Sequence, residues 1–249
     1  MERRKTTERQ EKSLRERRRL LQKKQRQNRI LRGIIRIVIG FLAVVGAVTI
    51  AKTIWQNRKG AQETAVVTEE KYIETQPDFS VELLSVNEYS RPGIALDQVN
   101  GIVVHWTANP GTTAEQNRNY FEGLSESGDT YASSHFVIGL EGEIIQCIPC
   151  NEIAYASNDR NSDTIAIECC IQDENGKFND ATYQSLIELV TWLMGRCDLS
   201  IDQVIRHYDV TGKDCPKYYV DHEDAWKQMK QDMLDYIETY GVAKSTEIK

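Results

Sequence analysis

The chain contains only four histidines and six cysteines among its 249 residues, and no segment of it repeats. The absence of a repeating unit excludes solenoid and propeller architectures. Acidic side chains are scarce in residues 1–36, which contain 4 Asp and Glu but 15 Lys and Arg. Residues 52–249 contain 33 acidic and 16 basic side chains. Residues 37–51, between these regions, carry no charge. Two parts of opposite charge are therefore joined by one apolar segment.

The apolar segment is short for a membrane span. It comprises the 15 residues Ile37–Ala51, whereas a membrane helix needs about 20. Neighbouring isoleucines lengthen it if Arg36 and Lys52 extend their charged ends toward the lipid headgroups. We therefore expect one transmembrane helix over residues 37–54.

The charges on either side of this segment predict its orientation. Lys and Arg next to a span resist translocation, so residues 1–36 are expected in the cytoplasm and the remainder outside the cell membrane. A cleaved signal peptide is the alternative, but its charged start is normally only a few residues long. The segment is therefore typical of an uncleaved signal anchor in a single-pass protein.

The basic tail also suits a second interpretation, which is nucleic-acid binding. Its arginines are interleaved with Glu8, Glu11 and Glu16, and it adjoins the expected membrane segment. This pattern favours a solvated or lipid-contacting helix. No nucleic-acid partner is expected.

Beyond the membrane segment, composition separates a linker from a folded domain. Residues 55–80 are polar with little periodicity, as in a linker. Residues 81–240 carry regular apolar runs and suffice for one domain with its own core, and residues 241–249 form a C-terminal tail. The sequence leaves the cysteines of this domain as thiols or disulfides of unspecified pairing. They are Cys147, Cys150, Cys169, Cys170, Cys197 and Cys215.

Hydrophobic periodicity predicts a strand, a helix, a hairpin, a strand, a helix, a strand and a last helix. Alternating β-branched runs indicate the strands, and apolar residues at helical spacing after a capping residue indicate the helices. This order predicts an α/β domain with a single mixed sheet and helices on both faces. The expected strands are 101–106, 135–139, 143–147, 164–170 and 203–206. The expected helices begin at Thr112 or Thr113, Asn179 and Asp221, with Tyr120 and Tyr240 on their apolar faces.

Two histidines and one cysteine carry the most specific chemical signal. His105 ends an apolar strand, and His207 and Cys215 lie eight residues apart much later in the chain. Two imidazoles and a thiolate suit Zn²⁺, and three protein ligands leave one position open for water, as catalytic zinc sites require. A single histidine or cysteine in an apolar strand is more often part of the core, and spacing alone leaves both interpretations open.

Glu168 is the one carboxylate inside the apolar strand expected over residues 164–170. Buried glutamates are rare without a partner or a metal ion nearby. Glu168 is therefore either a solvent-facing residue at the strand end or part of a functional cleft.

Four segments resemble the zinc-dependent N-acetylmuramoyl-L-alanine amidases, the family of the phage lysozyme-type amidase, which shares its fold with peptidoglycan recognition proteins. They follow one another in the family's order over most of residues 81–225. The segments are His105-Trp-Thr107 at a strand end, Ser133-Ser-His-Phe-Val-Ile138 with Gly142 in the hairpin, Asp163-Thr-Ile-Ala-Ile-Glu168, and His207-Tyr-Asp-Val-Thr-Gly-Lys-Asp-Cys-Pro216.

The resemblance implies a ligand set and a reaction. His105, His207 and Cys215 are implied to bind Zn²⁺, and the implied substrate bond is the amide between N-acetylmuramic acid and the first L-alanine of the peptidoglycan stem. Glu168 is implied to act as the general base and Lys213 to stabilise the oxyanion.

The same resemblance indicates residues that contact the substrate. Trp106, Tyr155 and Asn158 are expected to contact the glycan or the stem peptide. An ordinary surface loop is the alternative for the segment that contains Tyr155 and Asn158.

One position departs from the family pattern. Other branches have a catalytic tyrosine immediately before the residue aligned with His135, where this chain has Ser134. A serine hydroxyl has a shorter reach and a much higher pKa than a phenol, which favours Glu168 as the base. His135 itself is expected in the strand or behind the ligands, because a fourth protein ligand would exclude the water.

These features favour a membrane-anchored cell-wall amidase whose partner is peptidoglycan. A non-catalytic receptor or tether on the same fold is the alternative. Such receptors commonly lose a zinc ligand, whereas this chain retains three candidates and Lys213. A membrane scaffold that acts through its basic tail is a third possibility.

Overall fold

Residue 52 and residues 70–244 are described by the structure, which is a computed structural model. The folded domain lies in a compact unit that begins at Glu69. The expected tail over residues 1–36 and, apart from Lys52, the expected transmembrane helix over residues 37–54 lie outside the described residues. Within the described part, no helix combines the length and hydropathy needed to cross a bilayer.

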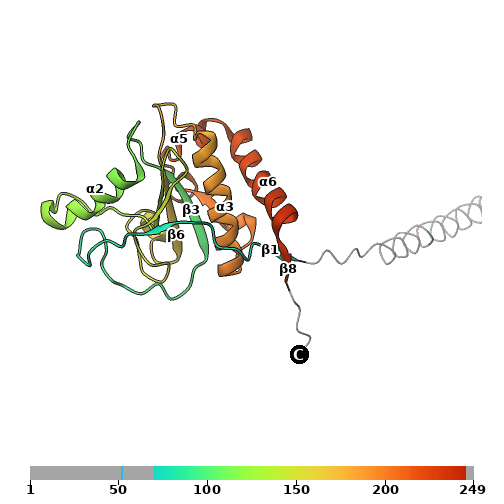
Figure 1. The fold of residues 1–249 in the computed structure, drawn as a ribbon, viewed down its shortest axis with the longest axis horizontal. Coiled ribbons are helices and arrows are strands. Elements are labelled where there is room, and N and C mark those ends of the chain that lie inside the picture. Colours follow the sequence, from blue (N-terminus) through green and yellow to red (C-terminus); the bar gives the residue numbers. More distant parts are fainter. Residues whose placement is uncertain (1–51, 53–69, 245–249) are drawn as a thin grey trace, which may run out of the picture. The chain divides into compact units, whose positions relative to one another are not determined.

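A six-stranded mixed sheet forms the centre of the domain (Figure 1), in the order β2-β5-β4-β6-β3-β7. β4, β6, β3 and β7 run parallel to one another, whereas β5 is antiparallel to β4. This confirms the mixed central sheet expected from the sequence, but it is not the single sheet predicted, because Lys71–Tyr72 and Val242–Ala243 form a separate two-stranded sheet. The strands are β2 (Ser80–Val81), β3 (Gly101–Trp106), β4 (Phe136–Ile138), β5 (Ile144–Gln146), β6 (Thr164–Cys169) and β7 (Val204–Arg206).

Helices cover both faces of the sheet, as predicted. α3 (Asp180–Cys197) and α6 (Glu223–Tyr240) pack on one face, where they share a core with Ile102, Ile165 and Phe136. α2 (Ala114–Ser127) lies on the other face, where its Phe121 packs with Val137. The central strands are therefore buried on both sides, which explains their nearly continuous apolar sequences.

Local capping explains where two of these helices begin. The Thr113 side chain accepts a hydrogen bond from the Gln116 backbone N–H, and the Gln116 side-chain oxygen accepts one from the Thr113 backbone N–H, so a capping box starts α2. The Asn179 side chain accepts from the Thr182 N–H at the start of α3. Both start signals agree with the sequence.

The last helix differs from the sequence prediction. Asp221 is the final residue of the short α5 (Lys217–Asp221), and α6 follows His222 without a side-chain cap. Two tyrosines expected on apolar faces are exposed instead, Tyr120 by 55% and Tyr240 by 67%. Both predictions were wrong because helical spacing continues past the area that the sheet can cover, and a phenol at that edge keeps its hydroxyl in water.

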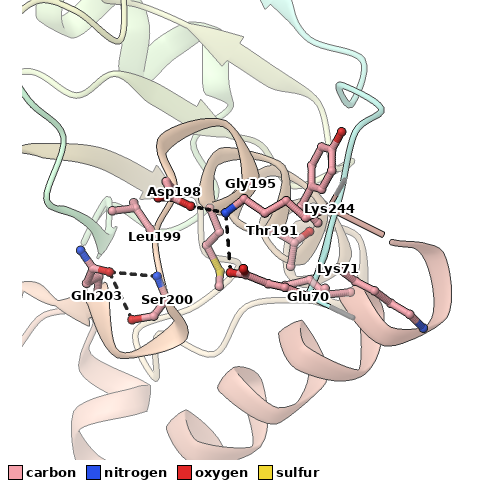
Figure 2. Close-up of a pocket in the computed structure, with 12 residues that line it drawn as sticks. Glu70, Lys71, Thr191, Gly195, Asp198, Leu199, Ser200, Gln203 and Lys244 are labelled. Carbon is pink, nitrogen blue, oxygen red and sulfur yellow. Dashed lines mark hydrogen bonds and ion pairs between the residues drawn. The ribbon is translucent and has the colours of Figure 1, made fainter. Parts of the chain in front are cut away.

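The folded unit begins before residue 81 and continues past residue 240. β1 (Lys71–Tyr72) pairs antiparallel with β8 (Val242–Ala243), and Ile73 is buried beneath this pair. Figure 2 shows that Lys244, which follows β8, forms ion pairs with Glu70, which precedes β1, and with Asp198, which follows α3. Strands of two residues carry no periodicity, so the polar composition of this stretch suggested a linker.

Candidate metal centre and active site

The parallel register of β3 and β6 places His105 and Glu168 together. His105 is directly opposite Glu168, and Val137 of β4 is opposite Glu168 on its other side. Residues opposite one another in parallel strands project from the same face, which here is the face that α2 covers. The functional residues therefore share one row at the carboxyl ends of the strands, where open α/β sheets bind ligands.

A tight loop after β7 brings His207 and Cys215 to the same place. His207 is the first residue of α4 (His207–Thr211), which follows β7 without a linker. The helix ends at Gly212, whose φ of 76° is readily adopted by glycine. The chain then turns back, and the Tyr208 N–H donates to the Cys215 carbonyl over 2.9 Å. One loop thus supplies two donors of the site.

Three metal-binding atoms converge in this region. The potential ligand atoms of His105, His207 and Cys215 all lie within 4.8 Å of one another, and all three residues are buried. Cys215 Sγ lies 3.7 Å from His105 Nδ1, and the two imidazole centroids are 4.7 Å apart. His207 Nδ1 is buried and has no hydrogen-bond partner among the described residues. The predicted juxtaposition is thus present, and these atoms could hold a metal ion.

Burial disfavours the charged form of all three groups. It lowers the pKa of His105 well below the ordinary value, with further lowering by His207 and Lys213, and it lowers the pKa of His207 in the same direction. It also raises the pKa of the Cys215 thiol to about 12, although a hydrogen bond from the Trp106 backbone opposes this. Neutral imidazoles offer free lone pairs, and a thiol of this kind becomes a thiolate when a metal ion supplies positive charge.

Glu168 projects into the same pocket, which has a volume of about 410 Å³ and also contains Lys213. Burial raises the pKa of Glu168 to about 8, and the Lys213 ammonium opposes this rise. Its Oε2 is buried without a partner in the described part of the chain. Of the two alternatives from the sequence, the structure selects the cleft. A carboxylate with a pKa near neutrality is suited to accept and return a proton.

The predicted substrate contacts all line this pocket. Trp106, Tyr155 and Asn158 contribute to its wall, together with the exposed Tyr131. Tyr131 meets Tyr155 edge to face, with ring centroids 5.5 Å apart. The Asn158 Oδ1 atom already has a protein partner, because it lies 2.8 Å from His207 Nε2. Substrate contact by these residues stays a prediction.

His135 and Ser134 form hydrogen bonds with backbone groups and not with the candidate ligands. The Ala166 N–H donates to His135 Nδ1 over 2.9 Å, and His135 Nε2 lies 2.9 Å from the Glu152 carbonyl oxygen. Both ring nitrogens are thus occupied by the backbone, as expected for a residue that is not a fourth ligand. The Ser134 hydroxyl is buried and donates to the Phe136 carbonyl, so it does not replace the missing tyrosine.

All six cysteines, which lie within the described range, are free thiols. Cys147 is fully buried in the α2-side core, and burial raises its pKa to about 12. Cys150, its neighbour in the CxxC sequence, is partly buried, and burial likewise raises its pKa to about 12. Of the alternatives left by the sequence, the structure has thiols and not disulfides, and four of the six are buried.

Sequence reasoning missed the residues that support His207. Arg206 forms ion pairs with Asp209 and Glu223 and donates to the Tyr219 carbonyl, so it ties β7 to α4, α5 and α6. Ser157 approaches the other histidine, with its Oγ 3.1 Å from His105 Nε2. The position of Arg206 next to a candidate ligand could have indicated its role. Nothing in the sequence indicated the contact between Ser157 and His105.

Comparison with known proteins adds an independent finding. Residues 95–218 match the family model described as N-acetylmuramoyl-L-alanine amidase. A probable N-acetylmuramoyl-L-alanine amidase of Bacillus licheniformis is 38% identical over 149 residues, which cover 55% of this chain and 42% of that protein. The N-acetylmuramoyl-L-alanine amidase CwlL of Bacillus licheniformis is 35% identical over 177 residues, which cover 66% of this chain and 48% of CwlL. The chain thus spans about half the length of these curated relatives.

A solved structure agrees with the fold. The catalytic domain of XlyA, an N-acetylmuramoyl-L-alanine amidase of Bacillus subtilis, matches with a TM-score of 0.54 and 28% identity. The match covers 63% of this chain and 99% of that domain. The described domain thus shares the fold of a solved amidase catalytic domain.

Proposed function

Because residues 95–218 belong to the N-acetylmuramoyl-L-alanine amidase family, we propose that this chain hydrolyses the amide between N-acetylmuramic acid and L-alanine in peptidoglycan. One observation carries the proposal beyond family membership. The donor atoms of His105, His207 and Cys215 converge within 4.8 Å in the pocket that also contains Glu168 and Lys213. A receptor that had lost catalysis would not need to keep this complete set.

The donor set fits Zn²⁺ as the metal. Nitrogen and sulfur ligands at tetrahedral angles around zinc lie about 3.5 Å apart, given bond lengths of about 2.0 and 2.3 Å, and Cys215 Sγ lies 3.7 Å from His105 Nδ1. Three protein ligands leave one coordination position for water or substrate. When bound, zinc supplies Lewis-acid polarisation of the substrate carbonyl and activation of water at neutral pH.

Glu168 moves the proton in the proposed reaction. Its carboxylate accepts a proton from the attacking water and then delivers it to the nitrogen of the departing L-alanine. Burial disfavours the charged form of Glu168. Uptake of the proton, which makes this side chain neutral, is therefore favourable. Ser134 is occupied with the backbone, and Glu168 is the acidic residue that the pocket offers beside the ligands.

Lys213 stabilises the negative charge that develops on the carbonyl oxygen. It precedes Cys215 by two residues in the same loop, so the backbone that positions the cysteine also positions the ammonium beside the pocket. Its charge already influences the pKa values of His105, His207 and Glu168. A fixed donor at an oxyanion typically contributes a factor of about 10²–10³ in rate.

We further propose that residues 37–54 anchor the enzyme in the cell membrane, with residues 1–36 in the cytoplasm and the domain on the peptidoglycan side. The support is the charge-free run and the basic residues that precede it. Protease added to intact protoplasts should remove the domain and spare the basic tail. Protection of the domain under these conditions would show the opposite orientation.

The activity is tested by incubating the purified protein with peptidoglycan, with and without a chelator. New amino termini of L-alanine should appear without new reducing sugar ends, should cease on chelation and should return with Zn²⁺. Binding to peptidoglycan without release of amino termini would instead support the receptor alternative. The scaffold alternative would be favoured if cells that produce the protein without residues 1–36 had an abnormal cell wall although the shortened protein kept its activity in vitro.

A further inference from the structure

The two imidazoles of the candidate metal centre present the same ring nitrogen to it. Cys215 Sγ lies 3.7 Å from His105 Nδ1, and the partnerless buried nitrogen of His207 is also Nδ1. The Nε2 atoms point away to other side chains. His105 Nε2 lies 3.1 Å from Ser157 Oγ, and His207 Nε2 lies 2.8 Å from Asn158 Oδ1. Each ring is thus held at its far nitrogen.

A single dipeptide makes both of these contacts. Ser157 and Asn158 are adjacent in the chain, whereas His105 ends β3 and His207 follows β7. An amide oxygen only accepts hydrogen bonds, so His207 must carry its proton on Nε2. The Ser157 hydroxyl can accept from His105 Nε2 in the same manner. A neutral imidazole with its proton on Nε2 has a free lone pair on Nδ1.

The loop that carries the dipeptide is itself fixed. The Asn161 side-chain oxygen accepts from the backbone N–H groups of Ala156 and Ser157, over 3.0 and 2.6 Å. The Asn158 backbone has a φ of 52°, which asparagine tolerates better than most residues other than glycine. Ser157 is 1% exposed, so little water competes for His105 Nε2. The acceptors are therefore in place independently of any metal.

We propose that Ser157 and Asn158 are positioning residues that lock His105 and His207 in the Nε2-protonated tautomer, so that both Nδ1 lone pairs face the metal position before a metal arrives. The inference rests on the proposed metal-dependent function and adds to it a role for two residues outside the ligand set. Outer groups that hold a ligating histidine generally contribute a factor of about 10–100 in metal affinity.

The tautomers can be read directly in the metal-free protein. The chain has four histidines, so long-range ¹H–¹⁵N correlation spectra of full-length protein labelled with ¹⁵N-histidine contain few signals. Metal-free wild type should show Nδ1 of His105 and His207 as the unprotonated nitrogen. Observation of protons on Nδ1 in both rings would overturn the proposal without any variant.

Variants then test which residues set the tautomer. Asn158→Gly removes the acceptor of His207 and tolerates the positive φ, and Ser157→Ala removes the hydroxyl beside His105. Each variant should give a mixture of the two tautomers at the histidine that has lost its partner. Each should also weaken Zn²⁺ binding about 10–100-fold in chelator competition. Asn158→Asp keeps an acceptor and should restore both properties. Asp159→Gly places the same glycine one position later, at an exposed residue, and should change neither.

The outcomes separate this proposal from the proposed function. Wild type that binds no zinc and releases no L-alanine termini contradicts the function, whatever the tautomers are. Wild type that binds zinc, together with Asn158→Gly and Ser157→Ala proteins of unchanged tautomer and affinity, contradicts the positioning role alone. Failure of Asn158→Asp to restore tautomer and affinity likewise contradicts it.

Discussion

Replacing Glu168 by glutamine tests both its buried ionisation and its proton transfer. The pKa of Glu168 is raised to about 8 from the ordinary 4.5, so the folded protein binds a proton that the unfolded chain has released between these pH values. Stability conferred by the neutral acid is therefore complete below pH 4.5 and is lost as the pH rises through 8. Glutamine does not ionise, so Glu168→Gln should lack this loss.

The magnitude follows from the two pKa values. At 1.36 kcal/mol per pH unit, the difference between about 8 and 4.5 corresponds to at most about 5 kcal/mol. Glu168 lines an open pocket and is only partly buried as a residue, so water screens part of this cost. We expect metal-free wild type to lose about 2–4 kcal/mol more than Glu168→Gln between pH 5 and pH 9.

Urea denaturation of both proteins in chelator, at several pH values, measures this difference. Glu126→Gln, at an exposed position on α2, is the matched control and should follow wild type. Added Zn²⁺ should shrink the difference, because a nearby dication favours the carboxylate. Parallel pH profiles for wild type and Glu168→Gln without metal would refute the buried ionisation.

The same variant tests catalysis. Glu168→Gln should retain zinc and lose about 10²–10⁴-fold in turnover, the usual contribution of a general base. Zinc content and release of L-alanine termini are measured on one preparation. Near-normal turnover would show that another group moves the proton.

Three further perturbations test neighbouring parts of the structure. Burial lowers the pKa of His135 to about 4 from 6.5, so wild type should lose about 3 kcal/mol of unfolding free energy as the pH falls from 6.5 to 4; a His135→Gln protein with the same acid slope in urea titrations would contradict this. Arg206→Met leaves the buried Tyr219 carbonyl without its donor and separates the solvent-accessible Asp209 and Glu223 from their partner, so it should cost about 1–3 kcal/mol of unfolding free energy, whereas a change below about 0.5 kcal/mol by the same measurement would show that these contacts are dispensable. Lys213→Ala should lower kcat about 10²–10³-fold with zinc retained, and loss of zinc instead would make the lysine a structural residue.

Much of the sheet could be predicted because its central strands are buried on both faces. Such burial requires continuous apolar β-branched runs such as Ile102–Val104, which are visible in the sequence. β1 and β8 were missed because two-residue strands show no sequence pattern. They form because they pair with each other and because Ile73 is buried. The cap of α6 was misplaced because a short helix, α5, uses Asp221 first.

The candidate site was predicted in composition but not in geometry. The residue types identified His105, His207, Cys215 and Glu168, yet their proximity depends on strand register and on the turn at Gly212. The contact between Ser157 and His105 joins residues 52 positions apart, and neither residue type predicts it. Tautomers and outer contacts of this kind follow only from three-dimensional structure.

Hydrolysis in water enriched in oxygen-18 tests the central claim most directly. A purified muropeptide with an intact glycan is incubated with the protein and Zn²⁺. The products are separated, and their masses are measured by mass spectrometry. Amide hydrolysis predicts one labelled oxygen in the lactyl carboxylate of N-acetylmuramic acid and none in the released peptide. Label at a sugar reducing end, or tight binding with no product at all, would contradict the assignment of this chain as a muramoyl-alanine amidase.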